Sequence, residues 1–124
     1  MRIILFVASF GAVGCVARYM LSKGVQSIFN GPFPYGTLAV NVLGAFIIGV
    51  IMEYSLRSAA ISHELRIGMV TGFLGGFTTF SAFSYETFRL LEDGLFFQAM
   101  LYVLASVIVC LVFTFAGIAA VRSL

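Results

Sequence analysis

Residues 72–84 read GFLGGFTTFSAFS, and they set three glycines and two threonines inside a segment that is otherwise apolar enough to cross a membrane. Both residue types weaken a helix. Backbone that leaves the helical hydrogen-bond ladder is tolerated at membrane depth only where its carbonyl groups face protein, a cavity or an ion. Phenylalanine recurs every third residue through the stretch, at Phe77, Phe80 and Phe83. The pattern predicts a broken membrane helix that lines a path for an ion.

The composition indicates an integral membrane protein. The 124 residues are 61% hydrophobic and 10% charged, whereas about a quarter of the residues in a soluble domain are charged. The formal net charge is +2, and no cluster of Lys or Arg is present that could neutralise successive phosphates, so we expect no nucleic-acid partner. Cys15 and Cys110 both lie within apolar runs, so we expect neither a disulfide nor a metal site at the cysteines.

The expected fold is an all-α membrane protein with one domain, residues 1–124, and four spans at about 3–22, 36–54, 66–91 and 95–121. The third span contains the break. An even number of spans places both termini on one side of the membrane. An alternative for the first span is a signal peptide with a lipoprotein cleavage site before Cys15. However, the apolar run continues to Leu21, which gives a retained span of about 20 residues.

Lys and Arg are shared almost equally between the two sides. The terminal side would carry Arg2, Arg57, Arg66 and Arg122, and the opposite side Arg18, Lys23 and Arg89. So weak a bias predicts insertion in both orientations, and two opposed copies would form an antiparallel homodimer. The alternative is that one charge near a helix end fixes the orientation. Because four short helices enclose little space, we expect any pathway to need an oligomer.

Two spans carry polar or small residues at four-residue spacing and therefore on one helix face. The residues are Thr37, Asn41, Ala45 and Gly49 in the second span, and Tyr102, Ser106, Cys110 and Thr114 in the fourth. The Asn41 amide either serves an ion path or only joins two helices, because leaving it unpaired in hydrocarbon is costly. The stripe in the fourth span either lines a polar track or bonds back to its own helix.

In the third span Thr79, Phe83 and Glu86 fall on one helical face, with Phe80 beside them. The positive edges of aromatic rings can hold an anion weakly enough to release it. Glu86 is a functional candidate because it is ionisable within a span, but it is also close enough to the interface to snorkel or to pair with Arg89.

Arg18, near the expected end of the first span, has two interpretations as well. It could attract anions into a vestibule, or it could anchor the helix end at the lipid headgroups. We favour the anchor.

Three motifs carry a family resemblance: GAVGCVARY at residues 11–19, GTLAVNVLG at 36–44 and GFLGGFTTFSAF at 72–83. In this order, in a four-span chain, they closely resemble the CrcB/Fluc fluoride channels over essentially the whole sequence. The third motif together with the other two is highly specific. Cys15 stands where alanine is usual in the family, and Ala82 where many members have threonine. Both differences are small and leave the resemblance intact.

The resemblance implies a fluoride-selective channel of the bacterial inner membrane that passes fluoride out of the cell passively and assembles as a dual-topology antiparallel homodimer with two pores. It implies a structural sodium ion on the backbone carbonyls of Gly75 and Thr78 from each subunit. Arg18, Glu86 and Thr79 are expected in the vestibule or in support of the pore. The implied pore residues are Asn41, Phe80, Phe83, Ser81 and Thr114, with Tyr102 and Ser106 on the track of the fourth span.

Two other classes of membrane protein stay open. A small proton-coupled drug or cation exporter would need a deeply buried carboxylate, and Glu86 is off-centre. A non-transporting scaffold would explain the faces of small residues, but not the broken helix with its regular phenylalanines. An enzyme is not expected, because the one histidine, His63, has no partner at catalytic spacing.

Overall fold

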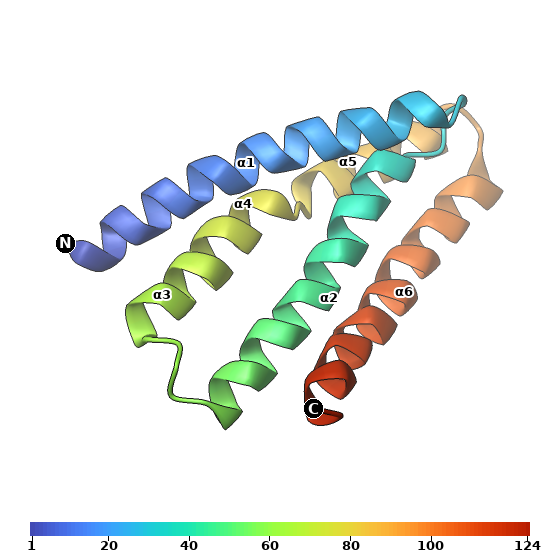
Figure 1. Ribbon diagram of the computed structural model, residues 1–124. Helices are drawn as coiled ribbons and strands as arrows, with labels where there is room; N and C mark the ends of the chain where they lie inside the picture. Colours follow the sequence, from blue (N-terminus) through green and yellow to red (C-terminus); the bar gives the residue numbers. More distant parts are fainter.

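The computed structural model describes all 124 residues, and they form helices joined by short connections (Figure 1). The elements in chain order are α1 (Arg2–Ile28), α2 (Tyr35–Arg57), α3 (His63–Ile67), the π-helical η1 (Gly68–Leu74), α4 (Gly75–Phe77), α5 (Ser81–Glu92) and α6 (Phe96–Arg122). Four stretches are long and apolar enough to cross a membrane: α1, α2, the run from α3 through α5, and α6. The predicted all-helical fold with four spans and a bent third span is confirmed.

The first helix is longer than the sequence predicts. α1 ends at Ile28 instead of near residue 22, so Arg18 and Lys23 lie within the helix and not at its end. The chain then turns through Gly31, whose φ of 126° suits glycine, and through two prolines before α2 begins at Tyr35. Gln26 holds this turn, because its side chain donates to the carbonyl of Phe33 and accepts from the N–H of Gly36.

The bend in the third span lies after the glycines, not at them. Gly72, Gly75 and Gly76 stay within η1 and α4, and the helix is interrupted from Thr78 to Phe80. Two of these glycines permit close packing on α1: a Cβ at Gly72 would meet Phe10 at 3.0 Å, and one at Gly76 would meet the Gly11 carbonyl at 2.7 Å. The glycines therefore bring the third span against α1, and the break needs a separate cause.

α2 and α6 lie side by side in the same direction (Figure 1). Their contact depends on small residues, since a Cβ at Gly49 would collide with the carbonyl of Thr114, and one at Gly117 with the carbonyl of Phe46. This agrees with the small-residue face expected on the second span. Close backbone approach of this kind is usual between membrane helices, which gain little from burying apolar side chains against each other.

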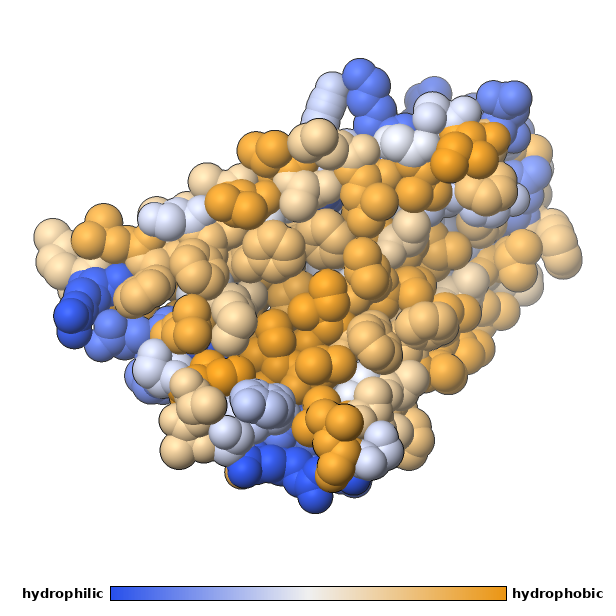
Figure 2. Space-filling model, in the orientation of Figure 1, coloured by the Kyte–Doolittle hydropathy of each residue, from blue (hydrophilic) through white to orange (hydrophobic).

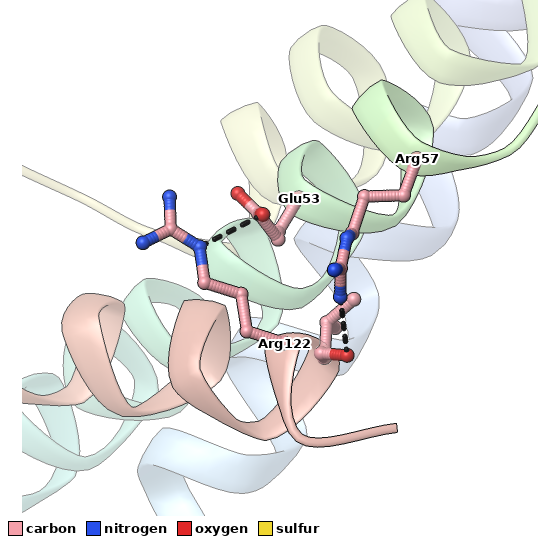
Figure 3. A network of polar contacts seen from close by, with 4 residues as sticks. Glu53, Arg57 and Arg122 are labelled. Carbon is pink, nitrogen blue, oxygen red and sulfur yellow. Dashed lines mark hydrogen bonds and ion pairs between the residues drawn. The ribbon is translucent and has the colours of Figure 1, made fainter.

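Both termini lie at the same end of the bundle, as four spans require (Figure 1). Arg2 pairs with Glu64 of α3 at 3.8 Å. Figure 3 shows how the ends of α2 and α6 are joined: Arg122 Nε donates to Glu53 Oε1 at 2.9 Å, and Arg57 donates to the carbonyl of Val121 at 3.2 Å. On the terminal side these contacts join α1 to α3 and α2 to α6.

The interior is small for a chain of this length. Only 17 of the 124 residues are buried, and many large apolar side chains are exposed. In Figure 2 the visible face is predominantly hydrophobic, and hydrophilic groups gather at the ends of the bundle. Such an outer surface suits contact with lipid, so the structure is that of a multi-pass membrane protein.

Candidate functional site

The interruption of the third span is held by one side chain of α2. Thr78 has extended backbone angles, and Thr79 lies outside any helix. The amide Nδ2 of Asn41 donates to the carbonyl of Thr79 at 3.0 Å, and the N–H of Thr79 donates to Oδ1 of Asn41 at 2.8 Å. Asn41 thus supplies both the donor and the acceptor that Thr79 would have found in a continuous helix. The observed amide is an interhelical link as well as a candidate pore group.

The interruption also releases carbonyl groups. Thr79 N–H is bonded to Asn41, and Ala82 N–H donates to the Thr79 hydroxyl at 3.1 Å. The carbonyls of Gly75 and Thr78 therefore do not receive the hydrogen bonds that an unbroken helix would give them. A third freed carbonyl, that of Gly76, accepts from Arg18 Nε at 2.9 Å. The carbonyls of Gly75 and Thr78, the residues expected to bind sodium, thus remain without these helix partners.

Beside the break lies a groove of about 440 Å³ between α2, the third span and α6. No charged side chain lines it, and its polar residues come from all three segments. The expected site residues that line it are Asn41, Gly75, Thr78, Thr79, Phe80, Phe83, Ser106 and Thr114. The stripe of the fourth span therefore faces this groove in part, through Ser106, Cys110 and Thr114.

The hydroxyl groups of the groove are not equivalent. Ser106 Oγ is buried and has no hydrogen-bond partner. Thr114 Oγ1, two turns further along α6, donates to the carbonyl of Ala45 at 3.0 Å. The Thr114 proton is therefore already used between helices, and the bond runs to α2 and not back to its own helix. Ser106 lines the groove, but its hydroxyl oxygen is covered by the surrounding atoms and stays unpartnered.

Two phenylalanine rings border the same groove. The centroids of Phe80 and Phe83 are 5.3 Å apart, and Phe83 lies 5.1 Å from the ring of Tyr102. Phe80 is 77% exposed although it sits at the centre of a membrane span. Phe83 is half-buried against the core that Tyr102 shares with Leu90 and Ala99. The Phe83 ring is thus fixed by packing, whereas the Phe80 ring projects from the protomer.

A second, wider hollow of about 830 Å³ opens at the end of the bundle away from the termini, and we call it the vestibule. Three basic residues line it, Arg18, Lys23 and Arg89, together with the acidic residues Glu86 and Asp93. Thr79 is the one residue that lines both the vestibule and the groove. The break therefore lies at the junction of the two spaces.

Glu86 is fixed inside the protein by two hydroxyl groups. Thr37 Oγ1 donates to Oε2 and Tyr102 OH donates to Oε1, each at 2.9 Å. The carboxylate does not pair with Arg89, which lies 3.9 Å from Glu92 instead. The pairing with Arg89 considered from the sequence is therefore wrong. Tyr102, expected on the pore track, is fully buried beneath the groove and serves as a donor to Glu86.

Arg18 is likewise not an anchor at a helix end. Because α1 continues to Ile28, Arg18 lies three turns inside the helix and reaches across to the Gly76 carbonyl. Arg18 thus bonds to the broken segment and also lines the vestibule. The interpretation that we favoured from the sequence is corrected by this bond.

Two further expected site residues, Ser81 and Thr79, also differ in position from the sequence-based expectation. Ser81 lines neither space and is exposed, with its hydroxyl 3.3 Å from that of Thr79. Since Thr79 precedes α5, it does not share a helical face with Phe83 and Glu86 as expected: it meets Phe83 at the groove and Glu86 at the vestibule. Thr37 was missed as a site residue, and its four-residue spacing from Asn41 was the available signal.

Comparison with known proteins agrees with the three motifs. The family model described as "CrcB-like protein, Camphor Resistance (CrcB)" matches residues 5–118. A protein of Geobacter sulfurreducens named fluoride-specific ion channel FluC is 65% identical over 124 residues, all of both chains. Proteins of the same name from Geotalea daltonii and Geotalea uraniireducens are 61% and 60% identical and cover 98% and 100% of each chain. The resemblance is confirmed, and the chain belongs to the CrcB family.

Proposed function

We propose that this protein is a fluoride-selective ion channel that lets fluoride leave a bacterial cell passively across the inner membrane. The observation that carries the proposal is the groove beside the break. It brings an unpartnered hydroxyl, an asparagine amide and two phenylalanine rings together without any charged side chain. Relatives that are 60–65% identical over the whole chain are named for fluoride conduction, which supports the same activity here.

The groove suits a small anion because its donors are close together and individually weak. Fluoride is strongly hydrated, so a selective path must replace its water with donors. The second N–H of the Asn41 amide and the ring edges of Phe80 and Phe83 are available, and the unpartnered Ser106 hydroxyl lies just below the surface of the groove. A lysine or arginine here would hold the ion too firmly. Several weak sites let the ion enter and also leave.

The vestibule supports the proposal at the entrance. Arg18, Lys23 and Arg89 raise the local concentration of anions over a wall that ends at Thr79. Glu86 faces the same space, but both of its oxygens accept hydrogen bonds from hydroxyl groups. The carboxylate is thereby held against α2 and α6, and it orients the Thr37 and Tyr102 hydroxyls.

A structural sodium ion fits the released carbonyls of Gly75 and Thr78. Carbonyl oxygens are the ligands that hard cations prefer, and such a cation would compensate for the helix hydrogen bonds these carbonyls have lost. One protomer offers two such oxygens, which is too few for a closed coordination shell. The same two residues from a second protomer would double the number.

An antiparallel homodimer of dual topology is supported by the polar and irregular surface that one protomer leaves exposed along its third span. Irregular backbone and polar side chains are not stable in contact with lipid tails. Yet Thr71, Gly75, Ser81 and the ring of Phe80 are exposed along the third span. A second copy, packed along the third span, would cover this strip, and the almost equal distribution of Lys and Arg favours its opposite orientation.

The alternative function, a proton-coupled exporter of drugs or cations, is favoured by one feature: Glu86 lies inside the protein and lines the vestibule. The two functions differ in their driving force. Proteoliposomes at neutral pH should release fluoride equally with and without a pH gradient if the protein is a channel. Flux that appears only with the gradient, and that Glu86→Gln abolishes, would support the exporter.

A further inference from the structure

We propose that Arg18 is a positioning residue for a sodium ion at the break: its bond to the Gly76 carbonyl orients the backbone that carries the carbonyls of Gly75 and Thr78. The proposal rests on the structural sodium described above and deepens it, because it names a side chain of α1 that sets how well the break binds the cation. The expected roles of Arg18 concerned the vestibule and the support of the pore, not the cation. Arg18 does not itself bind the ion.

Three residues of α1 meet the third span at Gly76. Gly11, Cys15 and Arg18 stand at i, i+4 and i+7, so they share one helix face. A Cβ at Gly76 would lie 2.7 Å from the Gly11 carbonyl oxygen and 3.0 Å from the Cys15 sulfur. The backbone of α4 is therefore in direct contact with α1 at the level where the Arg18 side chain reaches it.

The bond from Arg18 replaces a hydrogen bond that the helix has lost. In a continuous helix the Gly76 carbonyl would accept from the N–H of Phe80. Phe80 follows the break, and its N–H makes no such bond. Arg18 Nε donates to the Gly76 carbonyl instead, at 2.9 Å. Arg18 thus satisfies one freed carbonyl and leaves those of Gly75 and Thr78 to a cation.

The two consecutive glycines make this bond important for the geometry of the break. Backbone next to a glycine turns more freely than elsewhere, and Gly75 and Gly76 adjoin each other. The Gly75 carbonyl belongs to the peptide unit that joins it to Gly76, so fixing the Gly76 carbonyl restricts the orientation of its neighbour. Oxygens that are already oriented bind an ion more tightly than oxygens that must be ordered when it arrives.

The positive charge of Arg18 acts in the opposite sense, because it repels a cation at the break. Arg18→Gln and Arg18→Met separate the charge from the hydrogen bond, since both replacements are uncharged and unbranched. Nε2 of glutamine stands as many bonds from Cα as Nε of arginine and can donate to the carbonyl, whereas methionine places a methyl group there. Glutamine should bind sodium at least as tightly as arginine, and methionine more weakly.

The experiment measures binding of ²²Na⁺ to full-length protein in detergent, titrated against N-methyl-D-glucamine at constant ionic strength. The sodium affinity of Arg18→Met should be about tenfold lower than that of Arg18→Gln, the effect of one hydrogen bond. Lys23→Met is the control: it removes another charge of the vestibule, at a residue without a bond to the break, and should keep the affinity of the wild type.

Thermal unfolding of the same proteins separates positioning of the ion site from general support of the fold. Sodium raises the unfolding midpoint of a protein that binds it, by an amount that depends on its affinity. If Arg18 positions the site, this increase should be smaller in Arg18→Met than in Arg18→Gln. A residue that only supports the fold would lower the midpoint by the same amount with and without sodium, and that result would contradict the proposal.

The remaining outcomes are distinguishable. A wild type that binds no sodium overturns the structural sodium and the role of Arg18 with it. A wild type that binds sodium, with equal affinities in Arg18→Gln and Arg18→Met, overturns the role of Arg18 alone. Should Arg18→Met not fold, NMR of wild-type protein with ¹⁵N-labelled arginine decides. The Arg18 Nε signal, assigned by its absence from Arg18→Gln, should shift when sodium replaces N-methyl-D-glucamine, and an unchanged signal would contradict the proposal.

Discussion

Asn41 and Thr79, on different membrane spans, exchange two hydrogen bonds: the Asn41 amide donates to the Thr79 carbonyl at 3.0 Å and accepts from the Thr79 N–H at 2.8 Å. The pair fixes the only non-helical residues of the third span against α2. It also lies where the groove and the vestibule meet, since Thr79 lines both. The side chain that holds the break open is thus also a donor at the junction of the proposed pathway.

Asn41→Asp is expected to stop fluoride flux. A carboxylate cannot donate to the Thr79 carbonyl, it repels that oxygen, and its charge opposes entry of an anion. Loss of one hydrogen bond alone would cost about 1 kcal/mol, and the repulsion adds to it, so we expect a decrease of at least about tenfold in liposome efflux. Asn30→Asp, in the exposed connection before α2, is the matched control and should keep its flux.

Phe80→Ile tests whether the edge of the Phe80 ring contributes to fluoride conduction. Isoleucine keeps an apolar side chain at this exposed position but has no positive edge to offer an anion, so fluoride efflux should fall by about tenfold while the protein stays folded. Phe115→Ile makes the same replacement on α6, at a ring that is 70% exposed and outside the groove. Equal efflux from the two variants would mean that the ring of Phe80 takes no part in conduction.

Arg18→Ala and Lys23→Ala each remove one positive charge from the vestibule, but only Arg18 is bonded to the break. Both variants should conduct more slowly at low ionic strength, and the loss should shrink as salt screens the vestibule. Arg18→Ala should also lower the free energy of unfolding, by about 1–2 kcal/mol, because the Gly76 carbonyl loses its partner. Thermal unfolding in detergent compares the two; identical midpoints would contradict the structural role of Arg18.

Gly49→Ala should destabilise the protein. The new methyl group would collide with the carbonyl of Thr114, so α2 and α6 must separate or shift, at a cost of about 1–3 kcal/mol. The separation would also weaken the bond from Thr114 to Ala45. Gly24→Ala is the control, since a Cβ there meets nothing within 4 Å, and it should be neutral or slightly stabilising. A Gly49→Ala variant as stable as the control would contradict the close packing.

The periodic spacing of residues predicted most of the fold and many of the residues that lie next to one another in the site. The spacing of apolar residues gave four spans, and four-residue steps put Asn41 on a contact face and Ser106 beside Thr114. Spacing cannot tell which partner a polar group takes. Ser106 and Thr114 belong to one stripe, yet only Thr114 is bonded across to α2, because Gly49 lets the backbones approach there.

The contacts of Arg18 and Glu86 could not be predicted from the sequence, for a different reason. The end of α1 is misjudged by six residues, because apolar periodicity ends before the helix does. That error made Arg18 an end anchor. Glu86 finds its hydroxyl partners 49 and 16 residues away along the chain, and only the packed bundle brings them together. Sequence spacing alone indicates only partners that are close along the chain, such as Arg89.

The proposed channel is tested most directly by anion efflux from proteoliposomes reconstituted at limiting dilution, without a pH gradient and with fluoride and chloride compared in paired samples. A passive fluoride-selective channel predicts rapid release of fluoride from the vesicles that contain protein, while chloride is retained. Retention of both anions, or equal release of both, would contradict it.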